Sequence, residues 1–309
     1  MGKAEKVQVL MPSKNMSVRL YEALPDDNSP PLEDVLSLLQ AMSLPDRLRT
    51  LADGKQIRAE FIQPPSDGHP YWLVDFTRLR FEHGPGRASA GQPIQGFRLQ
   101  AGEGFGEETA ALYHPRSKSF ILQINQFGVR KGALEAYFSM IDPQTVLGYD
   151  IVPTLDPTVA AKLAHADRFS RFTLKVATGN ITAAMRNQNV SLARALEVGD
   201  QFQAPEMEIS LSVGHCRTSL STNVVRGMIR TTQRLIGDGD GSAVLQASVT
   251  GRNSADPEAK NEMLDLIAPM VAIEFDDLQL GTDLRFTRQS RFHALQRAFA
   301  GWRGIIRHR

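Results

Sequence analysis

The chain of 309 residues is 42% hydrophobic and 22% charged and has a formal net charge of +1. This composition is ordinary for a globular protein and excludes a disordered chain, and the length suffices for one large domain or two of middle size. The only cysteine, Cys216, excludes an intrachain disulfide and favours a reducing setting; we expect it to be buried. The N-terminal residues lack a secretory signal, and no apolar stretch approaches the roughly 20 residues of a membrane span, so we expect a cytoplasmic protein.

The first half of the chain is predicted to be rich in strands. Ser29, followed by two prolines, is typical of a helix start, and apolar residues from Leu32 to Met42 then recur at helical spacing. Alternating patterns predict strands over 56–62 and 71–81 and a hairpin over 109–125. The remaining expected segments are an irregular connection over 84–106 with a short strand at 97–99, and a helix over 131–141.

The pattern restarts near Asp167, where we place a domain boundary. The segments expected beyond it are a strand over 169–177, a helix over 191–196, a strand over 207–213, a helix over 219–236, a strand over 243–250, a strand pair within 263–280 and a basic terminal helix. The fold class is therefore predicted to be α+β, with mixed or antiparallel sheets and packed helices. The predicted domains are 1–166 and 167–309.

Positive charge gathers at the C-terminal end of the chain. Residues 285–309 contain seven arginines and two histidines and no acidic residue, so the rest of the chain is mildly acidic. Five apolar residues recur there at spacings of three and four and predict one stripe of an amphipathic helix: Phe292, Leu295, Phe299, Trp302 and Ile306. Four arginines are expected to lie off this stripe: Arg291, Arg297, Arg303 and Arg307.

Three interpretations of this basic helix are open. In the first, the apolar stripe docks on the protein and the arginines face nucleic-acid phosphate, which makes binding sensitive to salt. In the second, the helix only closes the core, and its arginines pair with surface acids. The third is attachment to a membrane surface through the cationic face and the aromatic side chains.

A second group of arginines lies on the predicted helix over 219–236. Arg226, Arg230 and Arg234 are four residues apart, and no acidic residue lies between positions 217 and 237 to relieve their repulsion. One interpretation is an anion-binding ridge. The alternative is pairing with acids distant in the chain, because a guanidinium binds carboxylate and phosphate equally well. The candidate acids are Glu262, Asp265, Glu274, Asp276 and Asp277.

Most candidate catalytic and metal motifs fail on their context. The glycine-rich segment 102–106 precedes a strand rather than a helix and has glutamates where phosphate would bind, which excludes a dinucleotide fingerprint. The segment 237–241 lacks the later glutamate of a calcium loop and is interpreted as a turn. The histidines show no spacing typical of metal ligands, so we expect no metal and no cofactor.

The predicted hairpin and the helix after it have the outline of a restriction-type nuclease core. Gln123 and Asn125 occupy positions where such a core would present a glutamate and a lysine, and neutral amides are poor Mg²⁺ ligands, so a site of this kind would be degenerate. The basic residues left to contact phosphate would be Lys118, Arg130 and Lys131. His114 is a candidate general base in the same segment.

Four segments carry a resemblance that covers most of the chain. They are GKQIRAEFI at 54–62, WLVDFTRLRF at 72–81, the hairpin ALYHP…FILQINQFGV, and the C-terminal succession of EISLSV, strand pair and arginine-rich helix. Their order resembles an uncharacterised group of bacterial and phage-borne proteins of similar length, often met among accessory and anti-phage defence genes. The resemblance implies no catalytic residues, and it implies a role in phage conflict or another nucleic-acid transaction.

The sequence favours a nucleic-acid-binding protein that acts as a sensor or partner subunit, with no chemistry of its own. The candidate binding residues are Arg226, Arg230, Arg234, Arg288, Arg291, Arg297, Arg303 and Arg307. One alternative is a phosphodiester hydrolase built around the hairpin at 112–131. Another is an interaction protein or homo-oligomer in which the terminal helix packs against a second subunit through Phe299 and Trp302.

Overall fold

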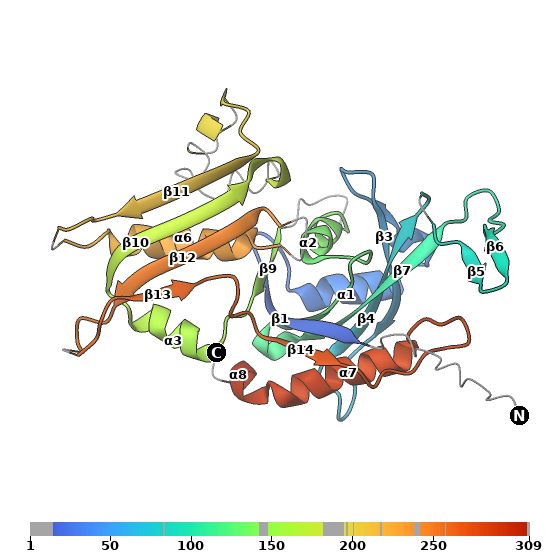
Figure 1. Ribbon diagram of the computed structural model, residues 1–309. Coiled ribbons are helices and arrows are strands. Elements are labelled where there is room, and N and C mark those ends of the chain that lie inside the picture. The colour runs from blue at the N-terminus through green and yellow to red at the C-terminus, as the bar shows by residue number, and fades with distance from the viewer. Residues whose placement is uncertain are drawn as a thin grey trace, which may run out of the picture.

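Two antiparallel sheets with separate hydrophobic cores organise the chain in the computed structural model (Figure 1). The structure describes residues 15–82, 84–141, 148–181, 195, 197–199, 201–216, 218–237, 242–256 and 258–307. Helices pack on both sheets, and the first half is rich in strands. The expected α+β class is therefore confirmed.

The first sheet has eight strands in the order β14-β1-β8-β7-β4-β3-β2, and β9 also pairs with β1. Their bounds are β1 Met16–Pro25, β2 Arg49–Thr50, β3 Gln56–Gln63, β4 Trp72–Arg80, β7 Phe105–His114, β8 Ser119–Ile124, β9 Tyr149–Pro153 and β14 Ala272–Phe275. All of these pairings are antiparallel. The predicted strands over 56–62 and 71–81 and the hairpin over 109–125 are confirmed.

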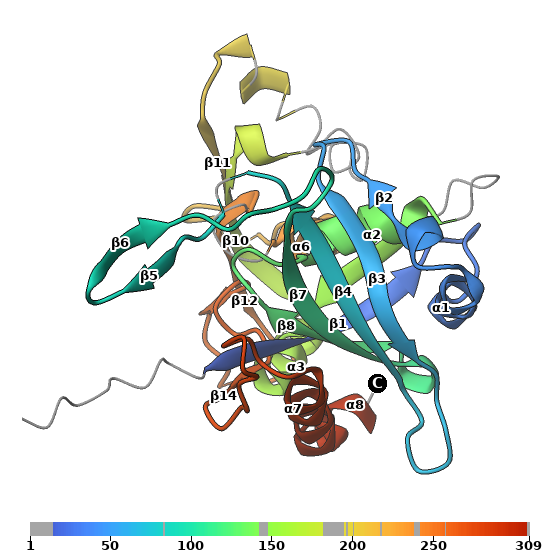
Figure 2. The ribbon, with the colours of Figure 1, turned by 90° about the vertical axis from the view of Figure 1, so that its right-hand side faces the viewer.

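Helices cover both faces of the first sheet, because its central strands carry apolar side chains on both sides. Trp72, Val74 and Phe76 of β4 are buried in the cluster that includes α1 (Leu32–Ala41) and α2 (Lys131–Ser139). Leu73, which lies between Trp72 and Val74, points to the opposite face and joins the cluster that includes the terminal helices. These helices are α7 Arg288–Gly301 and α8 Arg303–Arg307, seen below the strands in Figure 2.

The second sheet has four strands in the order β11-β10-β12-β13. Their bounds are β10 Arg168–Ala177, β11 Glu206–Ser212, β12 Val244–Arg252 and β13 Glu262–Asp265. The helices α6 (Thr222–Leu235) and α3 (Pro157–His165) pack on one face and bury an apolar core with it. Figure 1 shows α6 behind β10 and β12, and none of the described helices lies in front of these strands. The predicted helix over 191–196 lies outside the described residues except for Ala195.

The strands predicted as a pair within 263–280 belong to different sheets. β13 pairs with β12, whereas β14 pairs with β1, where Phe275 is the partner of Met16. The pairing prediction was wrong because the chain crosses between the two sheets here: Leu266 is buried in the second core and Val271 in the core under α7. The predicted boundary near Asp167 lies where the second sheet begins, yet the last strand and helices return to the first.

Residues 84–104, which we call the arm, form a projecting hairpin between β4 and β7 (Figure 2). Its strands are β5 Arg87–Ser89 and β6 Gln92–Gln95. The prediction of an irregular connection with a strand at 97–99 was wrong: pairing occurs earlier, across the two-residue turn at Ala90 and Gly91. Cys216 lies in the turn after β11 and is exposed, so its expected burial was wrong as well.

Candidate nucleic-acid interface

The terminal helix α7 is docked on the first sheet through its apolar stripe. Phe292, Leu295, Phe299, Trp302 and Ile306 are all buried, against residues of β1, β7 and β8. Tyr71 packs edge-on against Phe299, with 5.2 Å between the ring centroids. The predicted stripe is therefore confirmed, and its partner is the chain's own sheet rather than a second subunit.

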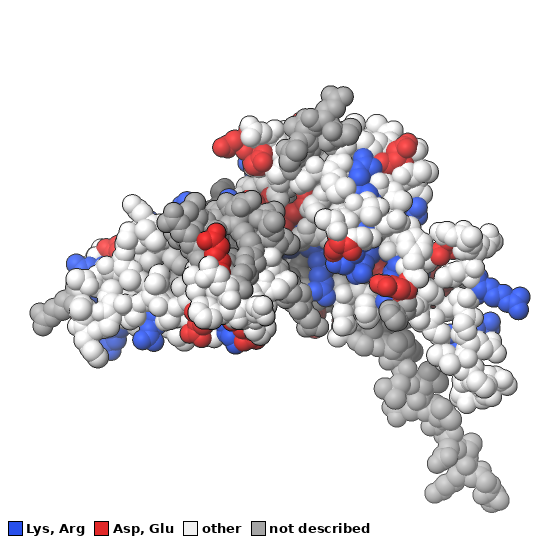
Figure 3. Space-filling view, turned by 90° about the horizontal axis from the view of Figure 1, so that it is seen from above, with Lys and Arg blue, Asp and Glu red and all other residues white. Residues whose placement is uncertain are grey.

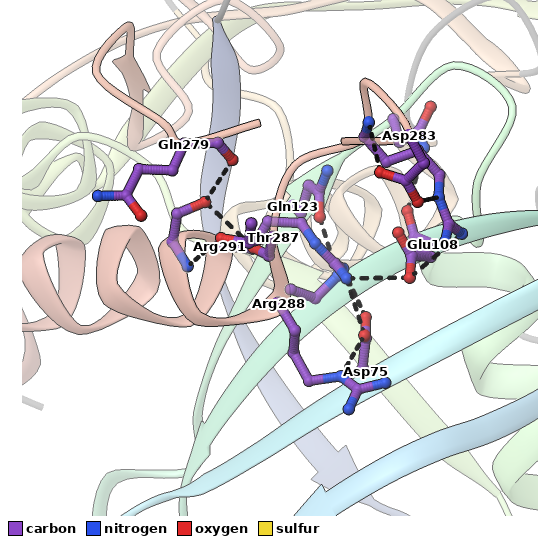
Figure 4. Close-up of polar contacts among 12 residues, drawn as sticks. Asp75, Glu108, Gln123, Gln279, Asp283, Thr287, Arg288 and Arg291 are labelled. Carbon is purple, nitrogen blue, oxygen red and sulfur yellow. Dashed lines mark hydrogen bonds and ion pairs between the residues drawn. The ribbon is translucent and has the colours of Figure 1, made fainter. Parts of the chain in front are cut away.

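A buried ion-pair cluster lies beneath the start of α7 (Figure 4). Asp75 of β4 is fully buried, and Arg291 is 1% exposed. Arg291 donates from Nη1 to Asp75 Oδ1 at 2.5 Å and from Nη2 to Oδ2 at 2.8 Å, and Arg288 Nε donates to the same Oδ2 at 3.0 Å. Arg291 Nη2 also lies 3.3 Å from Glu108 Oε1. We expected Arg291 to face a phosphate or a surface acid, and this is wrong. Arg291 is buried because the buried carboxylate of Asp75 must be paired with a cation.

The exposed arginines of the terminal segment are mostly paired as well. Arg297 donates to both carboxylate oxygens of Asp277, and this hydrogen bonding holds the pKa of Asp277 below its usual range. Arg285 pairs with Asp283, and its Nη1 lies 3.7 Å from Glu108 Oε1. Arg303 is exposed, whereas the side chain of Arg307 lies outside the described residues. The second interpretation, a closing helix with paired arginines, therefore describes α7 best.

The arginine row of α6 is held in a different way. Arg226 donates to the carbonyl oxygens of Ala164 and Ala166 at the end of α3, both at 3.2 Å. Arg234 forms an ion pair with Asp150 of β9, with 3.1 Å between Nε and Oδ2. Arg230 is exposed and has no partner among the described residues. The acids that we considered as partners of the row are not the ones used, since Glu262 pairs with Lys162 and Asp277 with Arg297.

The two predicted basic surfaces do not join into one groove. α6 packs on β10 and β12 of the second sheet and on β9 of the first, whereas α7 packs on β7, β8 and β1 of the first sheet. Figure 3, which views the molecule from above, shows basic and acidic side chains interspersed in small groups on that face. A continuous basic surface made of α6 and α7 is thus excluded, and a binding surface must be sought elsewhere.

Three other arginines gather on the open face of the second sheet, and we call them the arginine face: Arg168 and Arg171 of β10 and Arg252 of β12. Arg168 and Arg252 are direct partners in the antiparallel register, and Arg171 is the partner of Thr250. All three arginines are exposed, and within the described part of the chain none of them pairs with a carboxylate. Like charges directly opposite each other destabilise a sheet, so this arrangement is not explained by stability.

A β-bulge brings the arginine face together. In a regular strand, residues three positions apart point to opposite faces. The register shifts between Phe169 and Arg171, so that Phe169 and Phe172 both point into the core while Arg168 and Arg171 both point to solvent. Gly251 lies opposite Phe169, and a Cβ atom at position 251 would lie 2.8 Å from the ring of Phe169. The bulge and the glycine together place the three arginines on one face.

Hydroxyl and amide side chains surround the arginine face. Thr173 of β10 is paired with Ser210 of β11 and Ser248 of β12, in a row beside Arg171. The next row holds Lys175, whose partners are Glu208 and Gln246. Lys175 forms an ion pair with Glu206. The open face is therefore basic at the arginine end, neutral in the middle and more acidic toward the other end.

Arg252 of the arginine face also lines a cleft of about 460 Å³, together with residues of α3 and residues that follow β12. Its lining includes four basic and two acidic residues: Lys162, His165, Arg252, Lys260, Asp256 and Glu262. Asp167, next to Arg168, accepts hydrogen bonds from Ser254, and these are the main cause of its lowered pKa, to which the charge of Arg168 also contributes. Acidic residues near this end of the sheet therefore offset part of its positive charge, although none of them forms an ion pair with the arginine face among the described residues.

The segment compared above with a nuclease core is used structurally. Gln123 Oε1 accepts a hydrogen bond from the backbone of Ala110 at 3.0 Å, and Asn125 Nδ2 donates to the carbonyl of Glu108 at 3.0 Å. Lys131 is buried and pairs with Glu135, whose pKa is raised by burial. No group of three or more potential metal ligands occurs among the described residues.

His114 does not have the surroundings expected of a general base in this hairpin. Its ring packs against Phe299 of α7, with centroids 5.1 Å apart, and its Nδ1 lies 2.7 Å from Ser117 Oγ. Burial, assisted by the nearby Arg116, lowers the pKa of His114. The imidazole is therefore part of the packing between the hairpin and the terminal helix.

Sequence reasoning missed the arginine face. Its members come from two strands that are far apart in the chain, and RFSRF at 168–172 has a spacing that indicates no common face unless a bulge is known. The available signals were the two arginines at the start of a predicted strand and the glycine before Arg252.

Comparison with known proteins gives a family without an assigned activity. No curated protein matches the chain. No helix in the described part of the chain is long and apolar enough to cross a membrane. The model of a family of unknown function, DUF6731, matches residues 26–298, which include the second sheet, the strands of the first sheet other than β1, and most of α7. This agrees with the resemblance to an uncharacterised group, and the chain belongs to the DUF6731 family.

Proposed function

We propose that this protein binds nucleic acid through the arginine face of the second sheet and carries out no chemistry of its own. It acts as a sensor or partner subunit in the cytoplasm, and anti-phage defence in a bacterial or phage setting is the role that the family resemblance suggests. The observation that carries the proposal is the group of three exposed arginines without carboxylate partners among the described residues. The α7 arginines, first considered for this role, are left out because they are paired with acids.

The charges of the arginine face are suited to a phosphate backbone. Arg168 and Arg252 repel each other across the strand pair, and an anion bound between them removes this repulsion. Hydroxyl and amide groups such as those of Thr173, Ser248 and Gln246 donate readily to phosphate oxygens. No aromatic side chain is exposed on these strands for base stacking, so binding is expected to depend little on base sequence.

The proposal is tested by the salt dependence of binding. Fluorescence anisotropy with duplex and single-stranded probes, from about 50 to about 200 mM salt, should show affinity falling steeply as counterions are released. A triple variant, Arg168→Gln, Arg171→Gln and Arg252→Gln, should bind more weakly at low salt. Its plot of log affinity against log salt concentration should be shallower by about 1 for each arginine that contacts a phosphate.

A matched control separates these contacts from net charge. The triple variant Lys55→Gln, Arg285→Gln and Arg297→Gln changes the net charge equally but removes only cations that are paired with carboxylates and lie outside the second sheet. It should keep the wild-type salt slope. Absence of binding at the lowest salt, or an equal loss in both triple variants, contradicts the proposal.

A further inference from the structure

The ribbon of the arm is basic, and the one acidic residue of the arm, Glu103, lies at its base. Residues 84–102 contain Arg87 and Arg98 and no aspartate or glutamate. Every residue of β5 and β6 is exposed, and the ribbon extends away from the rest of the molecule in Figures 1 and 2. A two-stranded ribbon is marginally stable alone in water, so contact with a partner would stabilise it.

Apolar side chains lie uncovered on the same ribbon. Ile94, next to Pro93 in β6, is 72% exposed, and Phe97, beyond the end of β6, is 53% exposed. Other side chains of the two strands are amides and a hydroxyl: Gln92, Gln95 and Ser89. This combination of exposed apolar side chains, hydrogen-bonding amides and flanking arginines differs from an ordinary solvated loop, which is rich in charges of both signs.

The ribbon has the dimensions and chemistry of a segment that enters a nucleic-acid groove. Neighbouring strands lie about 4.8 Å apart, and the major groove of B-form DNA admits a two-stranded ribbon. Glutamine side chains can pair with base edges, arginines with the flanking phosphates, and isoleucine or proline can wedge between base steps. In Figure 1, β10 and β12 lie in front of α6 at one end of the molecule, and the arm, at the other end, extends toward the same front side, which is the left-hand side of Figure 2.

We propose that the arm binds duplex nucleic acid by inserting the ribbon of β5 and β6 into a groove, with Pro93 and Ile94 of β6 against the bases and Arg87 and Arg98 on the adjoining phosphates. This inference rests on the proposed function and adds a second contact and a preference for duplex over single strands. The unpaired arginines of both surfaces act on the same polyanion. The arm supplies the contact with bases that the arginine face lacks.

The experiment uses the full chain and duplexes that carry 2-aminopurine, whose fluorescence rises when a base is unstacked. Wild-type protein should raise the fluorescence on binding. The β6 variant, Pro93→Ala with Ile94→Ala, should lose this rise and bind the duplex about 5-fold or more weakly, as expected when an apolar wedge between base steps is removed. The variant Arg87→Gln with Arg98→Gln should keep the rise at saturation but reduce the salt slope by about 2.

The matched control is Val224→Ala with Leu284→Ala, which shortens two apolar side chains outside the arm. Val224 is 54% exposed and Leu284 is 76% exposed. It should leave fluorescence and affinity unchanged, and equal unfolding midpoints will show that all variants are folded. If the β6 variant keeps the fluorescence rise and the affinity, the arm inference is wrong. It is also wrong if single strands bind with the same dependence on Pro93 and Ile94, or if the β6 variant loses self-association while duplex binding is unchanged.

The two proposals fail in different ways. If the arginine-face triple variant loses binding while the arm variants bind as wild type does, the arm inference falls and the proposed function stands. If wild-type protein binds neither duplex nor single strand at low salt, the proposed function falls and the arm inference falls with it.

Discussion

Arginines occur in two contrasting environments in this protein. Under α7, Arg288 and Arg291 share Asp75, and on its surface Arg297 pairs with Asp277. On the second sheet, the arginine face has no such partners in the described part of the chain, and two of its members face each other directly. The most basic segment of the sequence is therefore the one whose charge is largely neutralised.

The difference shows what a dense run of arginines can and cannot indicate. A buried carboxylate such as Asp75 is costly unless it is paired, so nearby arginines are needed to fold the protein. An exposed arginine without a carboxylate has no such role, and beside another arginine it costs stability. Free charge, rather than the number of charges, therefore indicates a ligand.

The largest expected effect comes from breaking the buried cluster. Asp75→Asn leaves the buried Arg291 without its bidentate partner and with only Glu108 as a nearby anion, and the free energy of unfolding should fall by about 3 to 5 kcal/mol. Chemical denaturation measures this. The control Asp283→Asn breaks an exposed pair and should cost under about 1 kcal/mol. Equal losses in the two variants would mean that the buried pair is no more important than the exposed one.

The next effect concerns the apolar stripe of α7. Trp302→Ala removes an indole that is 9% exposed, and should lower the free energy of unfolding by about 3 kcal/mol. Arg303→Ala, one position further, changes an exposed side chain and should have little effect. Thermal unfolding at several protein concentrations checks both. An unchanged midpoint for Trp302→Ala at every concentration would show that α7 is not docked in solution.

The smallest effect has the opposite sign. Arg252→Gln removes the repulsion with Arg168, and should raise the free energy of unfolding by about 0.2 to 1 kcal/mol while weakening polyanion binding. Because the repulsion belongs to the pair, Arg168→Gln added to Arg252→Gln should give no further gain of this kind. If Arg252→Gln destabilises the protein, Arg252 has a structural partner, and the arginine face loses one of its members.

Much of the fold could be predicted from local patterns. The helix that begins at Leu32, the strands β3 and β4, and the stripe that buries Trp302 follow from periodicity alone. These features depend on residues close in sequence, so the pattern contains the information. The strand pair within 263–280 was mispredicted because nothing local shows that β13 and β14 pair with different sheets.

The sequence by itself determined that one apolar face of the terminal helix is buried and that basic residues are concentrated at that end. Tertiary structure alone decided which arginines are neutralised, because Asp75 and Arg291 are 216 positions apart. It also decided that Arg168 and Arg171 share a face, since this depends on a β-bulge that forms only when β10 pairs with β12. Periodicity is a property of neighbouring residues, whereas the pairing of charges depends on contacts between distant segments.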